Sequence, residues 1–429
     1  MEIIFLLNLF LLSFSFYLIY LSYLKRSVGI ILWTGLTVFY ALPQFVEILA
    51  DNLSYPLWVY TEATIFSLFF AFFYLASFVL IPRFKVLSPK FLRLELRYKQ
   101  ENILILVMFF CLCLSIACLL IGVYSVFGSL SSFSWVDVFE IRSSPFLIAS
   151  SYLWLVSSPI FFFAVVRKRF LLALVAFSLI LVAIFVFRVR AFLLPLFVPL
   201  ILYYLIFDSS QKRISLIRLF GIMFFSSFLL FAILGIAALR VVGSYDSLTD
   251  FQQVFVIILD LFSSPSSEFG LRNAFYLFIE KHNNFEGFGQ GLGYLRLFLL
   301  PIPSSLSLGI KPFDFASYMA LAYDPSSSVL GVNSMHPTIY GDSFANFGFF
   351  GFISSVFWAF IVRLFDHIIS SPARNIYSAS LFVIICSGLV LVTRGAVYNG
   401  IVNVYIVFIG CWLVSRLMLF LYPGIYRAH

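Results

Sequence analysis

Long apolar runs recur along almost the whole chain, and short polar segments separate them. The runs are roughly 18 to 25 residues long, the length that an α-helix needs to cross the hydrocarbon core of a bilayer. Lipid offers no partners to backbone polar groups, so each run is predicted to be a transmembrane helix. Eleven spans are expected, near residues 3–24, 28–49, 57–81, 102–126, 148–166, 170–187, 191–207, 219–239, 337–361, 377–393 and 395–415.

The segment between the eighth and ninth predicted spans, Arg240 to Met335, is much longer than the other loops. Apolar side chains between Phe251 and Phe262 recur there at helical spacing, in a stretch too short to span, which predicts a helix lying in the membrane interface. The predicted fold is therefore an all-α polytopic bundle that forms one integral membrane domain. It comprises residues 1–239 with eight spans, 240–335 as a large loop with short interfacial helices, and 336–429 with three spans.

Composition and charge support this topology. Of the 429 residues, 62% are hydrophobic and 11% charged, whereas soluble domains are about half apolar. The first run has neither a basic start nor a cleavage site, so it is interpreted as a retained span. The net charge of +8 comes mostly from alternate loops, including 25–26, 83–99 and 167–169, which argues for topology rather than nucleic-acid binding. The positive-inside rule places these loops in the cytoplasm, with the N-terminus outside and the C-terminus inside.

Sequence motifs for a metal or cofactor are missing. The five cysteines lie inside apolar runs, which argues against disulfides and a metal site. There is no DxD pair, HExxH, Walker lysine or G-x-S-x-G. The segment "GFGQGLG", Gly287 to Gly293, resembles a phosphate loop but lacks the preceding strand and the right spacing, so it is interpreted as a flexible hinge.

Several arginines lie on the predicted outer face, against the topology signal. Arg188, Arg190, Arg240 and Arg394 lie near span ends, and Arg272, Arg296 and Lys311 lie in the loop. An arginine drawn into the bilayer costs about 2.5–3.5 kcal/mol on insertion scales. Snorkelling or ion pairs with loop carboxylates would explain a single one. Four at one depth favour a shared anionic ligand, because a guanidinium binds phosphate oxygens in pairs.

The ninth predicted span opens with an unusually polar stretch, "SMHPTIYGDSFANFGFFG". Pro337 suits the first helical position, which places His336 at the outer surface. Asp342 is then about 7–8 Å deeper, with Asn346 one turn below on the same face. A tightly packed helix start would explain the glycines of this stretch. It does not explain Asp342 with Asn346, because a carboxylate at that depth must face protein or water.

The loop and the ninth span together resemble the bacterial O-antigen polymerases. The family pattern has a Pro-Arg element, then Lys-Pro, then a segment like E-x-x-x-N-F-G-x-x-G, and here the runs are "LLPIPSSLSLGIKPFDF" and "GDSFANFGFFG". Lys311-Pro312 and Asn346-Phe347-Gly348 match this pattern, while Ser304 stands where arginine is commoner and Asp342 replaces the glutamate. "RVRAFLLP" and "TRGAVYNG" extend the similarity to the middle and C-terminal thirds.

This resemblance implies a metal-independent, cofactor-free glycosyltransferase of the bacterial inner membrane. Such an enzyme polymerises undecaprenyl-diphosphate-linked oligosaccharide repeat units on the periplasmic side, with lipid-linked glycans as donor and acceptor and a chain-length regulator as partner. The implied catalytic residues are His336 and Asp342, either of which can deprotonate the acceptor hydroxyl. The implied substrate-binding residues are Arg188, Arg190, Arg240, Arg272, Lys311, Tyr340, Asn346 and Arg394, with Arg190, Arg240, Arg272 and Arg394 on the diphosphate.

Two alternatives remain from the sequence. An O-antigen ligase has a similar architecture and lipid donor. A lipid-linked oligosaccharide flippase or other transporter belongs to another class, and the single large loop and the outer position of the arginines argue against it, because transporter sites lie nearer the midplane.

Overall fold

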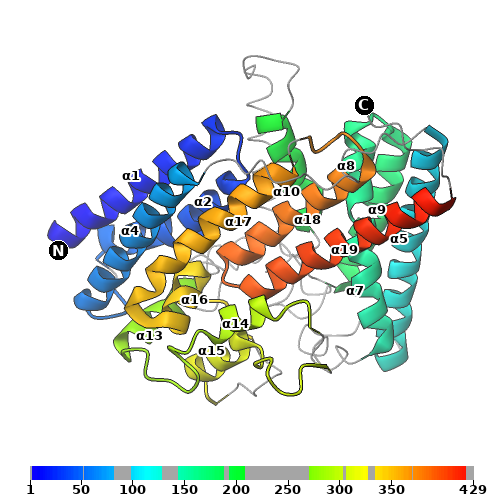
Figure 1. The fold of residues 1–429 in the computed structure, drawn as a ribbon. Coiled ribbons are helices and arrows are strands. Elements are labelled where there is room, and N and C mark those ends of the chain that lie inside the picture. The colour runs from blue at the N-terminus through cyan, green and yellow to red at the C-terminus, as the bar shows by residue number, and fades with distance from the viewer. Residues whose placement is uncertain are drawn as a thin grey trace, which may run out of the picture. The chain divides into compact units, whose positions relative to one another are not determined.

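The computed structural model describes residues 2–51, 53–81, 98–127, 144–187, 193–207, 270–302, 306–326, 334–369 and 371–421. Every regular element in these ranges is a helix (Figure 1). The predicted all-α class is confirmed for this part of the chain. The predicted elements at 219–239 and 251–262, together with Arg188, Arg190 and Arg240, lie outside the described residues.

Eight helical segments of the described part are long and apolar enough to cross a membrane. They are Glu2–Leu24, Gly29–Leu49, Leu57–Leu80, Gln100–Ser125, Pro145–Val166, Thr338–Ile368, Ile376–Thr393 and Val397–Leu421. Each coincides with a predicted span, and their length and composition support a membrane protein. The predicted span 170–187 coincides with the helix Phe170–Phe187, and the predicted span 191–207 corresponds to a shorter apolar helical segment, Leu194–Phe207.

Two compact units divide the chain. The first consists of Met1–Lys85, Ser263–His367 and Gly388–Val402. Its helices are α1 (Glu2–Leu24), α2 (Gly29–Leu36), α3 (Leu42–Leu49), α4 (Leu57–Leu80), α13 (Leu271–Glu280), α14 (Leu292–Phe298), α15 (Phe315–Tyr323), α16 (Thr338–Phe347) and α17 (Ser354–Ile368). α1 packs on α2 and α4, and α13 packs between α4 and α16. The rings of Phe66, Phe275 and Phe344 join these three helices, with centroids 5.5–5.6 Å apart.

The second unit consists of Val86–Phe262, Ile368–Ser387 and Asn403–His429. It contains α5 (Tyr98–Phe127), α7 (Pro145–Ser157), α8 (Pro159–Val166), α9 (Phe170–Phe187), α10 (Leu194–Leu202) and most of α18 (Ile376–Thr393) and α19 (Val397–Leu421). α5 and α7 pack closely, because the hydroxyls of Ser115 and Ser150 each donate to the other's carbonyl oxygen at 2.8 Å. Interhelical bonds of this kind hold helices together in lipid.

The predicted ninth span, 337–361, is not one regular helix. α16 ends at Phe347, and Gly348 adopts a φ of 62°, which side chains rarely tolerate. A short 3₁₀ turn, η9 (Gly348–Ile353), then leads into α17. The chain turns back so tightly that a Cβ at Gly351 would lie 2.1 Å from the carbonyl oxygen of Ser343. The prediction of a continuous helix is therefore wrong at this point, and the glycines serve this turn.

α16 is also buried on every side. All residues from Thr338 to Asn346 are buried, including polar ones. A helix that faced lipid would instead expose an apolar stripe. Gly341 packs on α13, where a Cβ would lie 2.9 Å from the Cβ of Phe275, rather than on a neighbouring span. α16 is thus a short internal helix that carries the polar residues of the segment into the protein.

Candidate functional site

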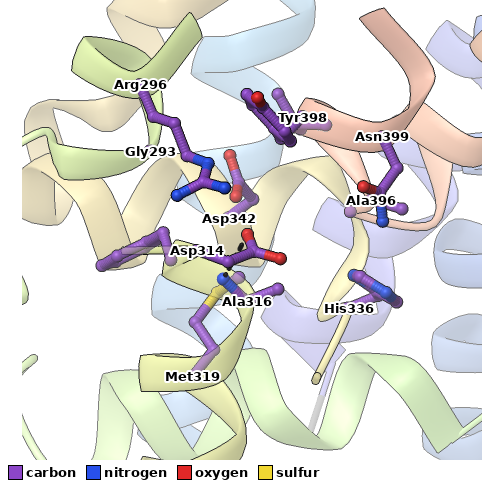
Figure 2. Close-up of a pocket in the computed structure, with 13 residues that line it drawn as sticks. Gly293, Arg296, Asp314, Ala316, Met319, His336, Asp342, Ala396, Tyr398 and Asn399 are labelled. Atoms are coloured by element: carbon purple, nitrogen blue, oxygen red, sulfur yellow. Dashed lines mark hydrogen bonds between the residues drawn. The ribbon is translucent and has the colours of Figure 1, made fainter. Parts of the chain in front are cut away.

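A small cavity lies where α14, the start of α15, the start of α16 and the turn between α18 and α19 meet (Figure 2). Its volume is about 20 Å³, which suits about one water molecule. The polar side chains that line it are Arg296, Asp314, His336, Asp342, Tyr398 and Asn399. The cavity lies entirely within the first unit.

The two predicted catalytic residues, His336 and Asp342, both line this cavity. His336 is half-buried and precedes α16, and Asp342 lies in the middle of α16 with 4% of its surface exposed. In the described part of the chain, Oδ2 of Asp342 is buried and has no hydrogen-bond partner. Leaving such an atom unpaired typically costs about 1–3 kcal/mol, so this oxygen is a strong sign of a site that binds a ligand.

A second carboxylate, Asp314, lines the same cavity and was not predicted. Its side chain caps α15, because Oδ1 accepts a hydrogen bond from the backbone N–H of Ala316 at 3.4 Å. The cap fixes the side chain at the start of the helix. Figure 2 shows Asp314 and Asp342 entering the cavity from α15 and α16. The site thus holds two carboxylates that come from different elements.

Two cations lie near the ring of Tyr398, of which Arg296 lines the cavity and the predicted ligand Lys311 does not. The guanidinium carbon of Arg296 lies 4.4 Å from the ring centroid, and Nζ of Lys311 lies 5.8 Å from it. Arg296 donates to the carbonyl oxygen of Pro312, while its buried Nε has no partner among the described residues. Lys311 donates to the carbonyl oxygen of Ile302 at 2.9 Å. These contacts hold positive charge next to the two carboxylates.

A hydrogen-bonded network supports α16 from behind. The hydroxyl of Tyr294 receives a 2.9 Å bond from Nε1 of Trp358 and pairs with the Ser343 hydroxyl at 3.1 Å. Ser343 also pairs with Ser354 at 2.8 Å. Burial, and secondly the charge of Asp342, raises the pKa of Tyr294 well above its usual value. Tyr294 therefore stays neutral and can keep its place in this network.

The glycine-rich segment that was predicted to be a hinge is fastened to α16. The backbone N–H groups of Gly289 and Gly291 donate to the carbonyl oxygens of Ala345 and Asn346 at 2.9 and 2.8 Å. The N–H of Gly293 donates to Oδ1 of Asn346 at 2.8 Å. These amides are used within the protein, so neither a phosphate loop nor a loose hinge describes the segment.

Asn346, a predicted substrate-binding residue, lies behind the cavity and does not line it. Its side chain is fully buried, accepts from Gly293 and donates to the carbonyl oxygen of Asp342 at 2.9 Å. Both ends of the amide are therefore occupied by protein partners. In this structure Asn346 joins α14 to α16, and its substrate-binding role stays a prediction.

Tyr340 and Arg272 do not line the cavity. Tyr340 is 1% exposed, with its ring 4.9 Å from Tyr40 and 5.1 Å from Phe70 between centroids. Arg272 forms an ion pair with Glu47 at 3.1 Å, and both side chains are nearly buried. In this structure Tyr340 packs among aromatic rings and Arg272 joins α13 to α3, and their substrate-binding roles stay predictions.

Arg394 contributes to the site through its backbone. It lies in the turn before α19, and its carbonyl oxygen accepts a hydrogen bond from the N–H of Thr338 at 3.0 Å. Thr338 has a φ of 65°, a left-handed conformation that β-branched residues rarely adopt. Such strain clusters at functional sites. The bond fixes the start of α16, and with it the approach to His336.

The site residues that sequence reasoning missed had weak signals. Arg296 was noted as a loop cation without a role. Asp314 stands two residues after the Lys-Pro pair, and Tyr398 and Asn399 belong to "RGAVYNG", a stretch singled out for its arginine. Only the fold brings these segments together.

Neither a metal site nor a known relative adds to this picture. Within the described ranges, no group of three or more His, Cys, Asp or Glu side chains is arranged to hold a metal ion. No family model, curated protein or solved structure matches the chain. The function is therefore argued from the site itself.

Proposed function

We propose that the protein is a glycosyltransferase that polymerises undecaprenyl-diphosphate-linked oligosaccharide repeat units into a surface polysaccharide of the O-antigen type. The observation that carries the proposal is the buried, unpartnered oxygen of Asp342 in a cavity that also holds Arg296. Transfer from a lipid diphosphate needs a base for the acceptor hydroxyl and positive charge for the leaving group. Both kinds of group are present here.

In the proposed reaction, Asp342 accepts the proton of the acceptor hydroxyl, and His336 is the alternative base. The acceptor oxygen forms a bond to the anomeric carbon of the donor glycan. The bond from that carbon to the diphosphate oxygen breaks, and the undecaprenyl diphosphate leaves with the electron pair. Arg296 and Lys311 then stabilise the charge that develops on the diphosphate. The sequence had assigned the diphosphate to Arg190, Arg240, Arg272 and Arg394, and of these Arg272 is paired with Glu47 in this structure.

The cavity must open for this reaction. Its volume of about 20 Å³ admits a water molecule but no sugar. The proposal therefore requires α15 to move away from α16 when the lipid-linked substrates bind, while α14 stays bonded to α16 through Gly293 and Asn346. Enzymes that handle reactive intermediates often close their sites in this way to exclude water.

The same proposal includes the type of membrane, the number of spans and the orientation of the chain. We place the protein in the bacterial inner membrane with eleven spans, with the N-terminus and the 240–335 loop in the periplasm and the C-terminus in the cytoplasm. The lipid-linked glycans are its substrates, and a chain-length regulator is its partner. The charge distribution of the loops supports this orientation.

Deletion of the gene, followed by gel analysis of the surface polysaccharide, tests the proposed function. We expect single repeat units on the core and no ladder, with the ladder restored by the wild-type gene and not by Asp342→Asn. Bare core with accumulated lipid-linked polymer would instead identify a ligase. Lipid-linked single units trapped inside the cell would identify a flippase, and an unchanged ladder would exclude all three.

A further inference from the structure

A second cavity of the first unit lies at the other end of α15. The first turn of this helix contributes Phe315 and Ala316 to the candidate site, and its last turn contributes Ala322 and Tyr323 to the second cavity. At 1.5 Å per residue, Ala316 and Ala322 are about 9 Å apart along the helix. A ligand longer than about 9 Å can therefore reach both cavities.

The lining of this second cavity combines aromatic and hydrogen-bonding groups. It has a volume of about 330 Å³, within the range of about 300–1,000 Å³ for small-molecule sites. It is lined by Leu277, Lys281, Asn284, Phe285, Ala322 and Tyr323. Aromatic rings offer apolar faces, and an amide or phenol offers hydrogen bonds to hydroxyl groups. Asn284 is exposed and Tyr323 is half-buried, so the polar groups of both side chains are accessible to a ligand in this cavity.

The charge of the cavity favours an uncharged ligand. Its one lining cation, Lys281, lies 3.6 Å from the carboxylate of Glu280. The candidate site differs, because neither Arg296, which lines it, nor the nearby Lys311 forms one of the ion pairs found among the described residues. The Arg296 guanidinium and the Lys311 ammonium are the groups that would bind a phosphate, and a neutral, hydroxyl-rich group suits the second cavity.

The turn next to the second cavity is held in place by specific contacts. His282 and Asn283 have φ values of 50° and 59°, and the Asn283 amide donates to the carbonyl oxygen of Ala345 at 3.3 Å. The Phe285 ring lies 5.1 Å from that of Phe288, which in turn lies 5.4 Å from Phe315. Because Phe315 lines the candidate site, this row of rings joins the two cavities. Preorganised walls of this kind lower the cost of binding.

We propose that this second cavity is a carbohydrate subsite, which binds neutral sugar residues of the glycan whose reacting end lies at Asp342. The inference rests on the proposed function and adds where the glycan is held. Phe285 and Tyr323 contact the sugar rings, and Asn284 bonds to their hydroxyls. Arg296 and Lys311 bind the diphosphate, so sugar and phosphate are recognised at separate places.

The test uses the full-length protein in nanodiscs and two probes. One is the lipid-free repeat-unit oligosaccharide released from the host's own polysaccharide, and the other is inorganic pyrophosphate. We expect Tyr323→Ala and Asn284→Ala to weaken oligosaccharide binding about tenfold or more, with pyrophosphate binding unchanged. Arg296→Ala should show the reverse. Glu286→Gln is the matched control, because Glu286 is exposed on the same turn but does not line the cavity.

The outcomes separate this inference from the proposed function. Equal oligosaccharide affinity in wild type and both variants overturns the subsite, whereas loss of the ladder in Asp342→Asn would still support the polymerase. An unchanged ladder in the deletion strain overturns the polymerase. Weaker oligosaccharide binding in Tyr323→Ala and Asn284→Ala would then still support a carbohydrate site in this cavity.

Discussion

The backbone N–H of Gly293 donates a 2.8 Å hydrogen bond to the buried side-chain oxygen of Asn346. The two chain segments approach so closely that a Cβ on Gly293 would lie 2.9 Å from Nδ2 of the same amide. This contact sets the distance between α14, which carries Arg296, and α16, which carries Asp342. The geometry of the candidate site therefore depends on a residue that does not line the cavity.

Asn346→Ala is the first test of this dependence. The substitution leaves the Gly293 N–H buried without its partner, which typically costs about 1–3 kcal/mol. We expect a lower melting temperature of the purified protein and a strongly reduced polysaccharide ladder. Asn284→Ala is the control for melting temperature, because it removes an exposed amide from a nearby turn. Equal melting temperatures of the two variants would show that the Gly293–Asn346 bond contributes nothing.

Asp342→Asn tests the proposed base. The amide keeps the shape of the side chain but cannot accept the proton, so the ladder should disappear while protein levels stay normal. Asp342→Glu should retain partial activity, because the carboxylate remains. His336→Ala should weaken polymerisation. Normal polymer from Asp342→Asn with an inactive His336→Ala would assign the base to the histidine instead.

Arg296→Lys and Arg272→Lys form a matched pair. Lysine keeps the charge but loses the paired hydrogen bonds of the guanidinium. A charge-assisted contact contributes about 1.5–3 kcal/mol, so at Arg296 the substitution should slow polymerisation about ten- to a hundredfold. At Arg272 it should mainly affect stability, because that side chain pairs with Glu47. A larger loss of rate in Arg272→Lys than in Arg296→Lys would indicate that Arg272 binds the diphosphate, as the sequence predicted.

Arg363 provides a prediction on stability alone. It is 6% exposed, its Nε donates to the carbonyl oxygen of Phe78 at 3.0 Å, and its guanidinium carbon lies 3.8 Å from the Phe78 ring centroid. It therefore caps the C-terminal end of α4. Arg363→Met leaves the carbonyl oxygen of Phe78 without this donor, which typically costs about 1–3 kcal/mol. The melting temperature should therefore fall clearly. Arg416→Met is the control, because Arg416 is exposed and its guanidinium carbon lies 5.7 Å from the Trp412 ring centroid.

The sequence allowed good prediction of where helices lie and which residues are unusual for a membrane segment. Apolar runs of spanning length report directly on burial in lipid, so eight described helices fall where they were expected. Asp342 was singled out because a carboxylate is costly in an apolar run, and the structure places it at a cavity. Both predictions rest on local composition, which one sequence contains.

Long-range pairing could not be predicted in the same way. Arg272 and Glu47 are 225 positions apart, and nothing local distinguishes an arginine that has a carboxylate partner from one that awaits a phosphate. The same holds for Asp314 and Tyr398, which reach the cavity from separate segments. The reversal at Gly348 was missed because Phe347 and Phe349 to Phe350 continue the apolar run through a turn. Hydropathy reports how apolar a segment is, but not where the chain turns within it.

The complete burial of α16 has a consequence for how the protein is made. An insertion machinery that recognises hydrophobicity receives residues 338–368 as one segment, and most of the apolar character comes from α17. α16 has no surface suited to lipid, so it becomes stable only when α13 and α4 cover it. Both helices precede α16 in the chain and are therefore synthesised before it. The candidate site is therefore expected to assemble late, after α17 has entered the membrane, which makes the polar α16 a checkpoint for correct folding.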